Sequence, residues 1–390
     1  KILIAVFCII LALGFSFSRL GKYIEFKLFD LRFNLRKLNI NDSLVKLIYV
    51  GDESLQVIGR WPWRREKQAY FLNLLQGKEL QSIIFDILFI EKDENFPNDD
   101  LAFVKAVKNA KNVFLPYYFI LQQNGNEIYE AKERILPFSP LKEAASDIGF
   151  VNANPDIDGI TRRFPLLIKF KEKKCFSLPL LIATKYLKVD FNNIEVKNKY
   201  ILLKNSSKGN ILIPINKKGE MLINYYGRNS FAHYSFLEII ASKNLEFLKN
   251  SIIFIGLSAT GTVDLRPTPI SSITPMVNVL ATVTDNIINK RFLFSVSKSL
   301  TIILVILIGI FTSVISICFS PRKSFFVVVS ALFIILLVGL YIFVKKGIVF
   351  NLTAPLSCVV FNYAGVSIYQ YIKEEKEKRT IKNLFKRYVA

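Results

Sequence analysis

Long runs of uncharged residues near both ends of the chain constrain its fold most, because each is apolar enough to enter a lipid bilayer. Residues 2–18 contain no charge, and the same holds for 299–319 and 324–344. About 20 helical residues cross the ~30 Å hydrocarbon layer, so the last two runs fit spanning helices. The run 347–372 is also uncharged but carries asparagine, glutamine and proline, which would face neighbouring helices. The sequence thus predicts an α-helical membrane region of four spans.

The first run has a second interpretation, a secretory signal peptide. It starts at Lys1 rather than at a methionine, so we expect the natural start of the protein to lie upstream. No small-residue cleavage motif stands clearly after the run, and Arg19 follows it at once. We therefore favour an uncleaved first transmembrane helix within residues 1–18.

The charges of the short loops predict the orientation in the membrane. Between the second and third spans the only charges are Arg322 and Lys323, which the positive-inside bias places in the cytoplasm. With three helices in 299–372, the segment 19–298 then lies outside the cytoplasm and the tail, residues 373–390, lies inside. Two lysines between the third and fourth spans oppose this assignment.

Composition excludes several classes of protein. With 52% hydrophobic residues, the chain is too apolar for intrinsic disorder. Three of the four cysteines lie in apolar runs, which leaves Cys175 without a partner outside them and argues against a disulfide scaffold. Basic residues exceed acidic ones by 52 to 31, but they are dispersed and form no nucleic-acid-binding module. We therefore expect the lipid bilayer as a partner, and no nucleic acid.

Segment 19–298 is predicted to be an α/β domain, a mixed sheet with crossover helices. Runs rich in β-branched and aromatic residues predict strands at 44–50, 82–89, 112–119 and 251–255. Helices are expected at 66–76, 99–110 and 276–290. Between these, 194–226 contains three short apolar stretches separated by the polar turns NSSKGN and NKKGE, so we expect an antiparallel meander there.

Acidic and basic side chains follow two of the predicted strands. If these strands are parallel neighbours, their acids meet at the carboxyl edge of the sheet, where open α/β sheets bind ligands. Arginines around the Trp-Pro-Trp sequence of the intervening loop could pair with a ligand anion or with the acids. The candidate ligand-binding residues are Asp52, Glu53, Arg64, Arg65, Asp86 and Glu91. The alternative, which we favour, is a structural ion-pair network.

Metal and phosphate motifs are weak. His233 is the only histidine, so a histidine-based metal or catalytic site is poorly supported. The sequence NPDIDG, residues 154–159, matches half of a calcium loop, but Pro165 stands where the bidentate glutamate is needed. The glycines of GLSATG, 256–261, lack the rest of a phosphate-binding motif. We expect turns at both places and no metal site.

The tail carries a helical stripe. Ile381, Leu384, Phe385 and Tyr388 recur at i, i+3, i+4 and i+7, which places them on one face of a helix. A helix that continues from the last span with such a stripe is suited to pairing with its copy in a homodimer, and these four residues are our candidates for signal transmission. The alternative is an amphipathic helix lying on anionic lipid.

Several segments in matching order resemble the type-two CHASE family, the cyclase/histidine kinase-associated sensory extracellular domains. They are FDLRF, GDESL, GRWPWRRE, IIFDILFIE, GFVNANPDIDGITRRFPLL, INYYG, FIGLSATGTVDLRPTPI and PMVNVLATVTDNII, which together cover residues 25–290. The resemblance implies a sensor domain preceded by one membrane helix and followed by three. The chain departs from it at Leu280-Ala281, where the family often has His-Ala.

The tail RTIKNLFKRYVA resembles the stretch that leads into class III nucleotide cyclase domains. The resemblance implies the sensor portion of a bacterial plasma-membrane receptor, with an unknown extracytoplasmic ligand and an adenylate or guanylate cyclase output beyond Ala390. Magnesium or manganese is expected in that output domain, whereas this segment supplies no catalytic residue and no cofactor. Two alternatives remain: a protein kinase or diguanylate cyclase as the output, or an envelope protein that binds cell-wall polymer.

Overall fold

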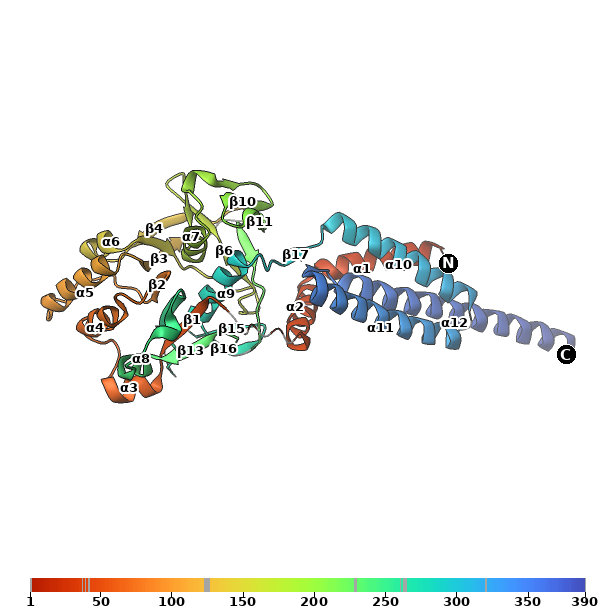
Figure 1. Cartoon of the computed structure of the whole chain (residues 1–390). Helices are drawn as coiled ribbons and strands as arrows, with labels where there is room; N and C mark the ends of the chain where they lie inside the picture. The colour runs from red at the N-terminus through yellow and green to blue at the C-terminus, as the bar shows by residue number, and fades with distance from the viewer. Residues whose placement is uncertain are drawn as a thin grey trace. The chain divides into compact units, whose positions relative to one another are not determined.

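A computed structural model of the chain describes residues 2–36, 38, 40, 43–122, 127–227, 230–259, 261, 265–319 and 321–389. The chain forms two compact units. One, here called the α/β unit, is Arg36–Leu293. The other, the helical unit, combines Lys1–Leu35 with Phe294–Ala390. Figure 1 shows the elements of both units.

The α/β unit is built on a seven-stranded mixed sheet. Every pairing in it is parallel except that of β3 with β4. In spatial order its strands are β13 (Ala232–Ser235), β1 (Val45–Val50), β14 (Ile252–Leu257), β2 (Ser82–Asp86), β3 (Val113–Leu121) and β4 (Ala131–Ile135), with β5 (Asp147–Phe150) also pairing with β3. The predicted mixed α/β sheet is confirmed, and each predicted strand is present.

One face of the sheet carries most of the apolar core. Side chains alternate between the faces of a strand, and Ile48, Ile83, Phe85 and Ile253 all point into this buried cluster. Five helices cover the cluster (Figure 1): α3 (Asp52–Ile58), α4 (Glu66–Leu75), α5 (Pro97–Ala110), α6 (Ser139–Ala144) and α8 (Phe236–Ala241). The predicted helices at 66–76 and 99–110 therefore correspond to α4 and α5.

The opposite face is covered by α7 (Leu178–Tyr186) and α9 (Met276–Ile288). All residues of α9 except Asn278 are buried. Gly256 makes this packing possible, because a Cβ atom at that position would lie 2.6 Å from Cβ of Val277. The close packing of α9 on this face of the sheet thus requires a glycine at position 256.

The α/β unit also contains smaller antiparallel sheets. One has three strands, β9 (Ile194–Val196), β10 (Tyr200–Ser206) and β11 (Gly209–Pro214). The others are two-stranded: β6 (Arg163–Pro165) with β12 (Glu220–Leu222), β7 (Leu167–Phe170) with β8 (Lys173–Phe176), and β15 (Leu265–Thr268) with β16 (Ser271–Pro275). Two short 3-10 helices span Phe191–Asn193 and Glu246–Leu248. The predicted meander is correct for the hairpin around NSSKGN. The prediction for the third strand of the meander is wrong, because β12 pairs with β6 rather than with β11.

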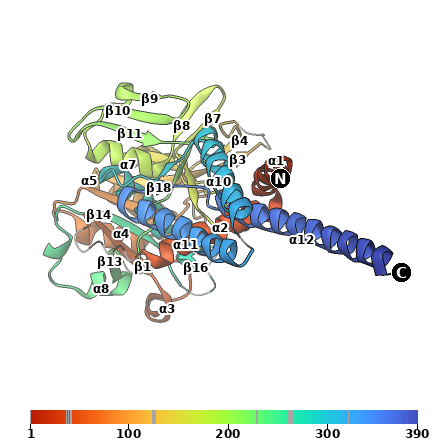
Figure 2. The same cartoon turned by 90° about the vertical axis from the view of Figure 1, so that its right-hand side faces the viewer.

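The helical unit contains α1 (Ile2–Phe17), α2 (Arg19–Leu35), α10 (Lys298–Cys318), α11 (Pro321–Lys346) and α12 (Thr353–Val389), with a short parallel pair of β17 (Phe294–Ser295) and β18 (Ile348–Val349). α12 packs along α1, α10 and α11. Figures 1 and 2 agree that the last part of α12 runs beyond α10 and α11.

Among the described residues, fewer helices than the expected four are long and apolar enough to cross a membrane. Lys298–Ser316 and Arg322–Lys346 qualify, and the bent pair Leu3–Phe17 with Arg19–Leu35 adds a third if it counts as one span. The fourth predicted run does not qualify, because its asparagine, glutamine and proline lower the hydropathy of α12. The expected domain boundaries also differ from the compact units. Residues 19–35 form α2 within the helical unit, so the α/β unit is 36–293 rather than 19–298.

Candidate functional site

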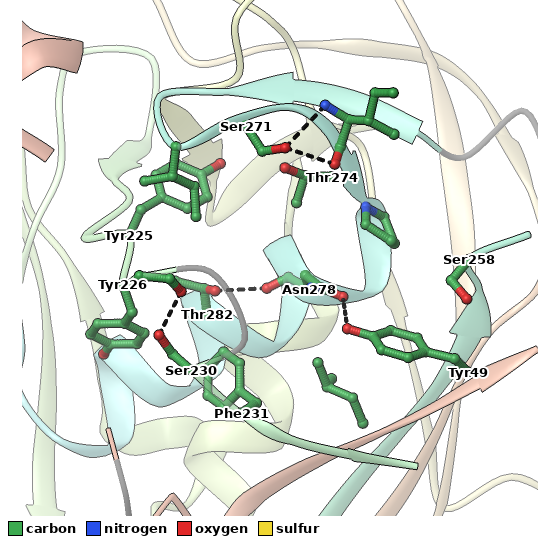
Figure 3. Close-up of a pocket in the computed structure, with 15 residues that line it drawn as sticks. Tyr49, Tyr225, Tyr226, Ser230, Phe231, Ser258, Ser271, Thr274, Asn278 and Thr282 are labelled. Atoms are coloured by element: carbon green, nitrogen blue, oxygen red, sulfur yellow. Dashed lines mark hydrogen bonds between the residues drawn. The ribbon is translucent and has the colours of Figure 1, made fainter. Parts of the chain in front are cut away.

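A cavity of about 270 Å³ lies on the α9 face of the sheet. Its walls come from β1, from α9, from the β15–β16 hairpin and from the segment that follows β12. Figure 3 shows Tyr225, Tyr226 and Phe231 on one side of the pocket, and Tyr49 and Ser258 on the other. We call this cavity the hydroxyl pocket, because serine, threonine and tyrosine supply most of its polar groups.

Hydrogen bonds fix the polar wall of the hydroxyl pocket. The Tyr49 hydroxyl donates to Oδ1 of Asn278 over 2.8 Å. Since this bond identifies the oxygen of the amide, Nδ2 is the free end, and it has no protein partner among the described residues. Thr282 donates to the backbone oxygen of Asn278 over 2.7 Å, one turn along α9. The Tyr49 bond therefore orients the amide, and its two N–H donors have no partner among the described residues.

The tyrosines of the pocket stay protonated. Burial raises the pKa of Tyr49 to about 12, against a smaller opposing effect of the hydrogen bond with Asn278. Burial also raises the pKa of Tyr225 and of Tyr226 above the ordinary value. Loss of solvation disfavours the phenolate, so all three side chains are neutral hydroxyls at physiological pH.

Behind the hydroxyl pocket lies a buried polar network. The Tyr226 hydroxyl donates to Oδ2 of Asp285 over 2.6 Å, and Asp285 is completely buried. Nδ2 of Asn286 donates to the Tyr226 oxygen over 2.7 Å. Arg291 lies 3.3 Å from the same carboxylate. The charge of Asp285 is thus compensated by a hydroxyl and a guanidinium, as a buried carboxylate requires.

The network continues to both ends of the α/β unit. Arg36, the first residue of the unit, donates to Oδ1 of Asn224 and, over 2.9 Å, to the backbone oxygen of Tyr225. Nδ2 of Asn224 donates to the backbone oxygen of Arg291 over 3.0 Å. Residues 224–226 therefore touch the hydroxyl pocket, the start of the unit and the end of the unit. Sequence reasoning missed this arrangement, although INYYG and TDNII were both quoted for the family resemblance.

The predicted acidic residues are not gathered at one site. β14 lies between β1 and β2, so the strands preceding Asp52 and Asp86 are not neighbours. Asp52 and Glu53 form the exposed first turn of α3. Asp86 lines a second cavity of about 270 Å³ at the carboxyl ends of β2 and β14, together with Trp61 and Arg266. A cavity therefore does exist at the predicted sheet edge, with one of the predicted acids.

The predicted arginines are held by α5. Arg64 pairs with Asp99 over 2.9 and 3.2 Å. Arg65 pairs with Asp100 and donates to the backbone oxygen of Glu91. These contacts are those of the structural ion-pair network that we favoured. A ligand-binding role for any of the six predicted residues stays a prediction.

The half calcium loop is a turn closed by an arginine. Asp156 N–H donates to the Ile160 oxygen over 3.0 Å. Arg162, which is only 1% exposed, lies 2.8 Å from both oxygens of Asp158 and 3.1 Å from Asp156. Burial acts to raise the pKa of Asp158, but Arg162 outweighs it and the pKa lies below the ordinary value. Arg163 also pairs with Asp156.

Metal-binding groups of three or more histidine, cysteine or acidic side chains do not occur in the described parts of the chain. In the GLSATG segment, Gly256 and Leu257 end β14, and residue 260 lies outside the described residues. The turn predicted there is tested only in part for this reason.

In the helical unit, α2 is locked to the start of α12. Oε2 of Glu25 accepts from the backbone nitrogens of Leu352, at 2.7 Å, and Thr353, at 2.9 Å. Its Oε1 lies 2.6 Å from Arg32, which is 3% exposed and also donates to the backbone oxygen of Phe350 over 3.0 Å. Glu25 thus caps the positive end of α12. The Arg32 of the quoted FDLRF motif was the available signal for this contact.

The predicted transmission stripe is partly described. Ile381, Leu384 and Phe385 lie on α12 with 57%, 51% and 67% of their surface exposed. The side chain of Tyr388 lies outside the described residues. Three of the four predicted residues therefore present an apolar face on the part of α12 that follows its contacts with α10.

Comparisons with known proteins identify one family. A family model described as the CHASE2 domain matches residues 2–315, which is most of the chain and includes the whole α/β unit. No curated protein and no solved structure matches the chain.

Proposed function

This chain belongs to the CHASE2 domain family of sensory domains in signalling proteins, and from that premise we propose that it is the sensing and membrane part of a bacterial receptor with a nucleotide cyclase as its output. The α/β unit recognises a stimulus outside the cytoplasm. The helical unit carries the response through the plasma membrane to the tail of α12.

Four crossings of the bilayer fit this role. Two helices of the unit qualify as spans by length and hydropathy. For the other two, α1 packs along α12, and two polar residues of α12 bind α10. Asn362 is fully buried and accepts a hydrogen bond from Ser313 over 3.0 Å, and Gln370 donates to the backbone oxygen of Ser316 over 2.9 Å. Polar side chains that face protein rather than lipid are compatible with a crossing helix.

The orientation follows from the number of crossings. Four spans, with Arg322 and Lys323 on the cytoplasmic side, place the α/β unit outside the cytoplasm and the end of α12 inside. The two lysines that end α11 argue in the opposite direction, but they lie at the rim of a span, where long basic side chains reach the headgroups.

The observation that carries the proposal is the capping of α12 by Glu25. α12 is one continuous helix of 37 residues, so a displacement at its first turn is transmitted along its whole length. Its first turn is bound to α2, the element that directly precedes Arg36 in the chain. A stimulus that favours one position of α2 over another would shift α12 with it.

The cyclase output rests on the resemblance of the tail to the segment that leads into class III cyclase domains. Magnesium or manganese would act in that output domain. The tail carries an apolar stripe on one helix face, so we propose a homodimer in which Leu384 and Phe385 of two tails pack together. Exposed apolar residues at helical spacing are suited to such pairing.

The test uses the complete gene product in membranes from a host that makes no cyclic nucleotide. We expect cyclic AMP or cyclic GMP to form from ATP or GTP when magnesium or manganese is present. The pair Glu25→Gln and Glu374→Gln then tests the transmission. Glu374 is exposed on the same α12, so only Glu25→Gln should alter the output. Formation of cyclic diguanylate or of a phosphoprotein instead would refute the cyclase output.

A further inference from the structure

We propose that the hydroxyl pocket is the ligand site of the sensor and that its ligand is a small, uncharged molecule rich in hydroxyl groups, of the size of a monosaccharide or a polyol. The inference rests on the proposed sensory function, and it names the class of stimulus that the α/β unit recognises.

The charge of the described lining disfavours most other classes of ligand. Among the residues that the structure describes, those that line the hydroxyl pocket include no lysine, arginine, histidine, aspartate or glutamate, although the chain as a whole has a net charge of +21. A carboxylate, a phosphate or an ammonium group bound here would lose its hydration without gaining a counter-charge. The buried Asp285 behind the pocket is already bound by Tyr226 and Arg291. A neutral ligand is therefore strongly preferred over a charged one of the same size.

The available hydrogen-bonding groups match hydroxyl groups. Ser258 Oγ and Asn278 Nδ2 have no partner in the portion of the chain that the structure describes, and both residues line the pocket. Figure 3 shows Ser258 on the same side as Tyr49 and Asn278 beside the Tyr49 hydroxyl, whose oxygen still has a lone pair to accept with. This wall thus offers both donors and acceptors. A hydroxyl group, which donates and accepts at once, is the complement of such a wall.

The rest of the lining suits the carbon skeleton of such a molecule. Tyr225 and Phe231 present aromatic rings across the pocket from the polar wall (Figure 3). A sugar ring has apolar C–H faces and a polar rim, and pockets that combine aromatic side chains with a few fixed polar groups bind molecules of this kind. The volume of about 270 Å³ lies near the lower limit of roughly 300 Å³ for ligand pockets, so one ring fits and a polymer does not.

The location of the pocket connects binding to the ends of the α/β unit. A ligand in contact with Tyr225 and Tyr226 touches residues whose other contacts include Arg36 and Asp285. Arg36 begins the unit, and Asp285 holds Arg291 near its end. A ligand that shifts residues 225 and 226 therefore changes the contacts of both connections through which a signal must leave the unit.

The experiment measures binding on the purified full chain in detergent. Thermal unfolding and isothermal titration are run with glucose, galactose, N-acetylglucosamine, myo-inositol and glycerol. Glucose 6-phosphate and glucosamine serve as charged counterparts of glucose. We expect at least one neutral compound to raise the Tm at ~10 mM, since a ligand that binds only the folded state stabilises it. Its charged counterpart should bind at least about tenfold more weakly.

Ser258→Ala tests the site itself. Because the Ser258 hydroxyl has no protein partner among the described residues, its removal should leave the Tm without ligand unchanged and weaken binding about threefold to tenfold. Ser272→Ala is the matched control, since Ser272 is exposed on the same side of the unit in the β15–β16 hairpin but does not line the pocket. It should bind like the unmodified chain.

Three results would overturn the inference: no shift with any neutral compound, tighter binding of the charged counterparts, or equal effects of the two serine substitutions. These results concern binding alone. The proposed function would still stand if the Glu25→Gln variant altered cyclic-nucleotide output, so the two proposals fail separately.

Discussion

Oε2 of Glu25 lies 2.7 Å from the backbone nitrogen of Leu352, a residue 327 positions further along the chain. The same carboxylate group binds Arg32, so one side chain joins α2, a buried arginine and the first turn of α12. A negative charge at this position compensates both the guanidinium and the positive end of the helix.

Replacing Glu25 by glutamine should destabilise the helical unit. The amide can still accept from the backbone of α12, but Arg32, 3% exposed, loses its ion-pair partner. Breaking a buried pair from one side costs about 3–5 kcal/mol, so the full chain in detergent should show a clearly lower Tm. Glu374→Gln, on an exposed position of α12, should leave the Tm unchanged. Equal Tm values for both variants would remove the role assigned to Glu25.

Two glycines of the first helical segments should respond to alanine in opposite directions. A Cβ at Gly21 would lie 2.1 Å from the backbone oxygen of Phe15, at the 72° bend between α1 and α2. At Gly14 a Cβ meets nothing within 4 Å. We expect Gly21→Ala to lower the free energy of unfolding by about 1–3 kcal/mol through overpacking, and so to lower the Tm. Gly14→Ala should raise the free energy of unfolding by about 0.5–1 kcal/mol, and so raise the Tm slightly. Changes in Tm of the same sign for the two variants would contradict the close packing of Gly21 at the bend.

Removal of the Tyr226 hydroxyl should weaken the α/β unit. Tyr226→Phe removes the 2.6 Å donor of the fully buried Asp285 and takes the Tyr226 acceptor from Nδ2 of the buried Asn286. A buried polar group left unsatisfied costs about 1–3 kcal/mol. Tyr200→Phe is the control, because Tyr200 is 36% exposed. Thermal unfolding followed by tryptophan fluorescence reports on this unit, since both tryptophans lie in it. An unchanged transition for Tyr226→Phe would show that the network contributes nothing to stability.

Arg162 should make stability sensitive to acid. The pKa of Asp158 is depressed in the folded state by Arg162. A depressed pKa contributes stability that is complete above the ordinary value of 3.8 and is lost as the pH falls below it. Arg162→Met should therefore be strongly destabilising at pH 7, by about 3 kcal/mol or more.

The same variant provides the pH test. The difference in Tm between Arg162→Met and the unmodified chain should narrow as the pH is lowered from 7 to below 3.8, because a protonated Asp158 needs no guanidinium. Arg163→Met should cost less, since Arg163 is 30% exposed and, among the described residues, forms an ion pair with Asp156 alone. A difference that stays constant with pH would exclude the Arg162–Asp158 pair as its source.

The apolar stripe of the tail should be required for transmission but not for folding. Leu384→Asp combined with Phe385→Asp places two charges on side chains that are more than half exposed, so the Tm should stay unchanged. Cyclic-nucleotide output of the complete gene product should no longer follow the stimulus. As a control, Lys382→Asp changes an exposed charged position of the same helix segment. Unaltered output in the double variant would argue against pairing of the tails.

Much of the α/β unit could be predicted because its signals are local. The apolar runs that become β1, β2, β3 and β14 are largely buried, and such strands are recognisable from runs of β-branched and aromatic residues. The strand order could not be predicted. β14 inserts between β1 and β2 from more than 160 residues away in the chain, and that pairing is a property of the assembled sheet.

The partners of individual side chains were even harder to predict from the sequence. A structural ion-pair network was favoured for Arg64 and Arg65, but its acidic partners were not predicted: they are Asp99 and Asp100, because the first turn of α5 lies beside the loop. The hydroxyl pocket escaped prediction for a different reason. It is made of neutral side chains such as Tyr49 and Asn278 from several segments, and residues of these types occur throughout any chain without forming a motif.

The central claim is that the α/β unit and the end of α12 lie on opposite sides of the plasma membrane. Labelling of single cysteines in intact cells tests this claim most directly. In a background with the four native cysteines replaced, Lys199→Cys reports on the α/β unit and Lys382→Cys on the tail; both positions are exposed. A membrane-impermeant maleimide should label position 199 in intact cells and position 382 only after the cells are lysed. Labelling of both positions in intact cells, or of neither, would contradict the proposed receptor.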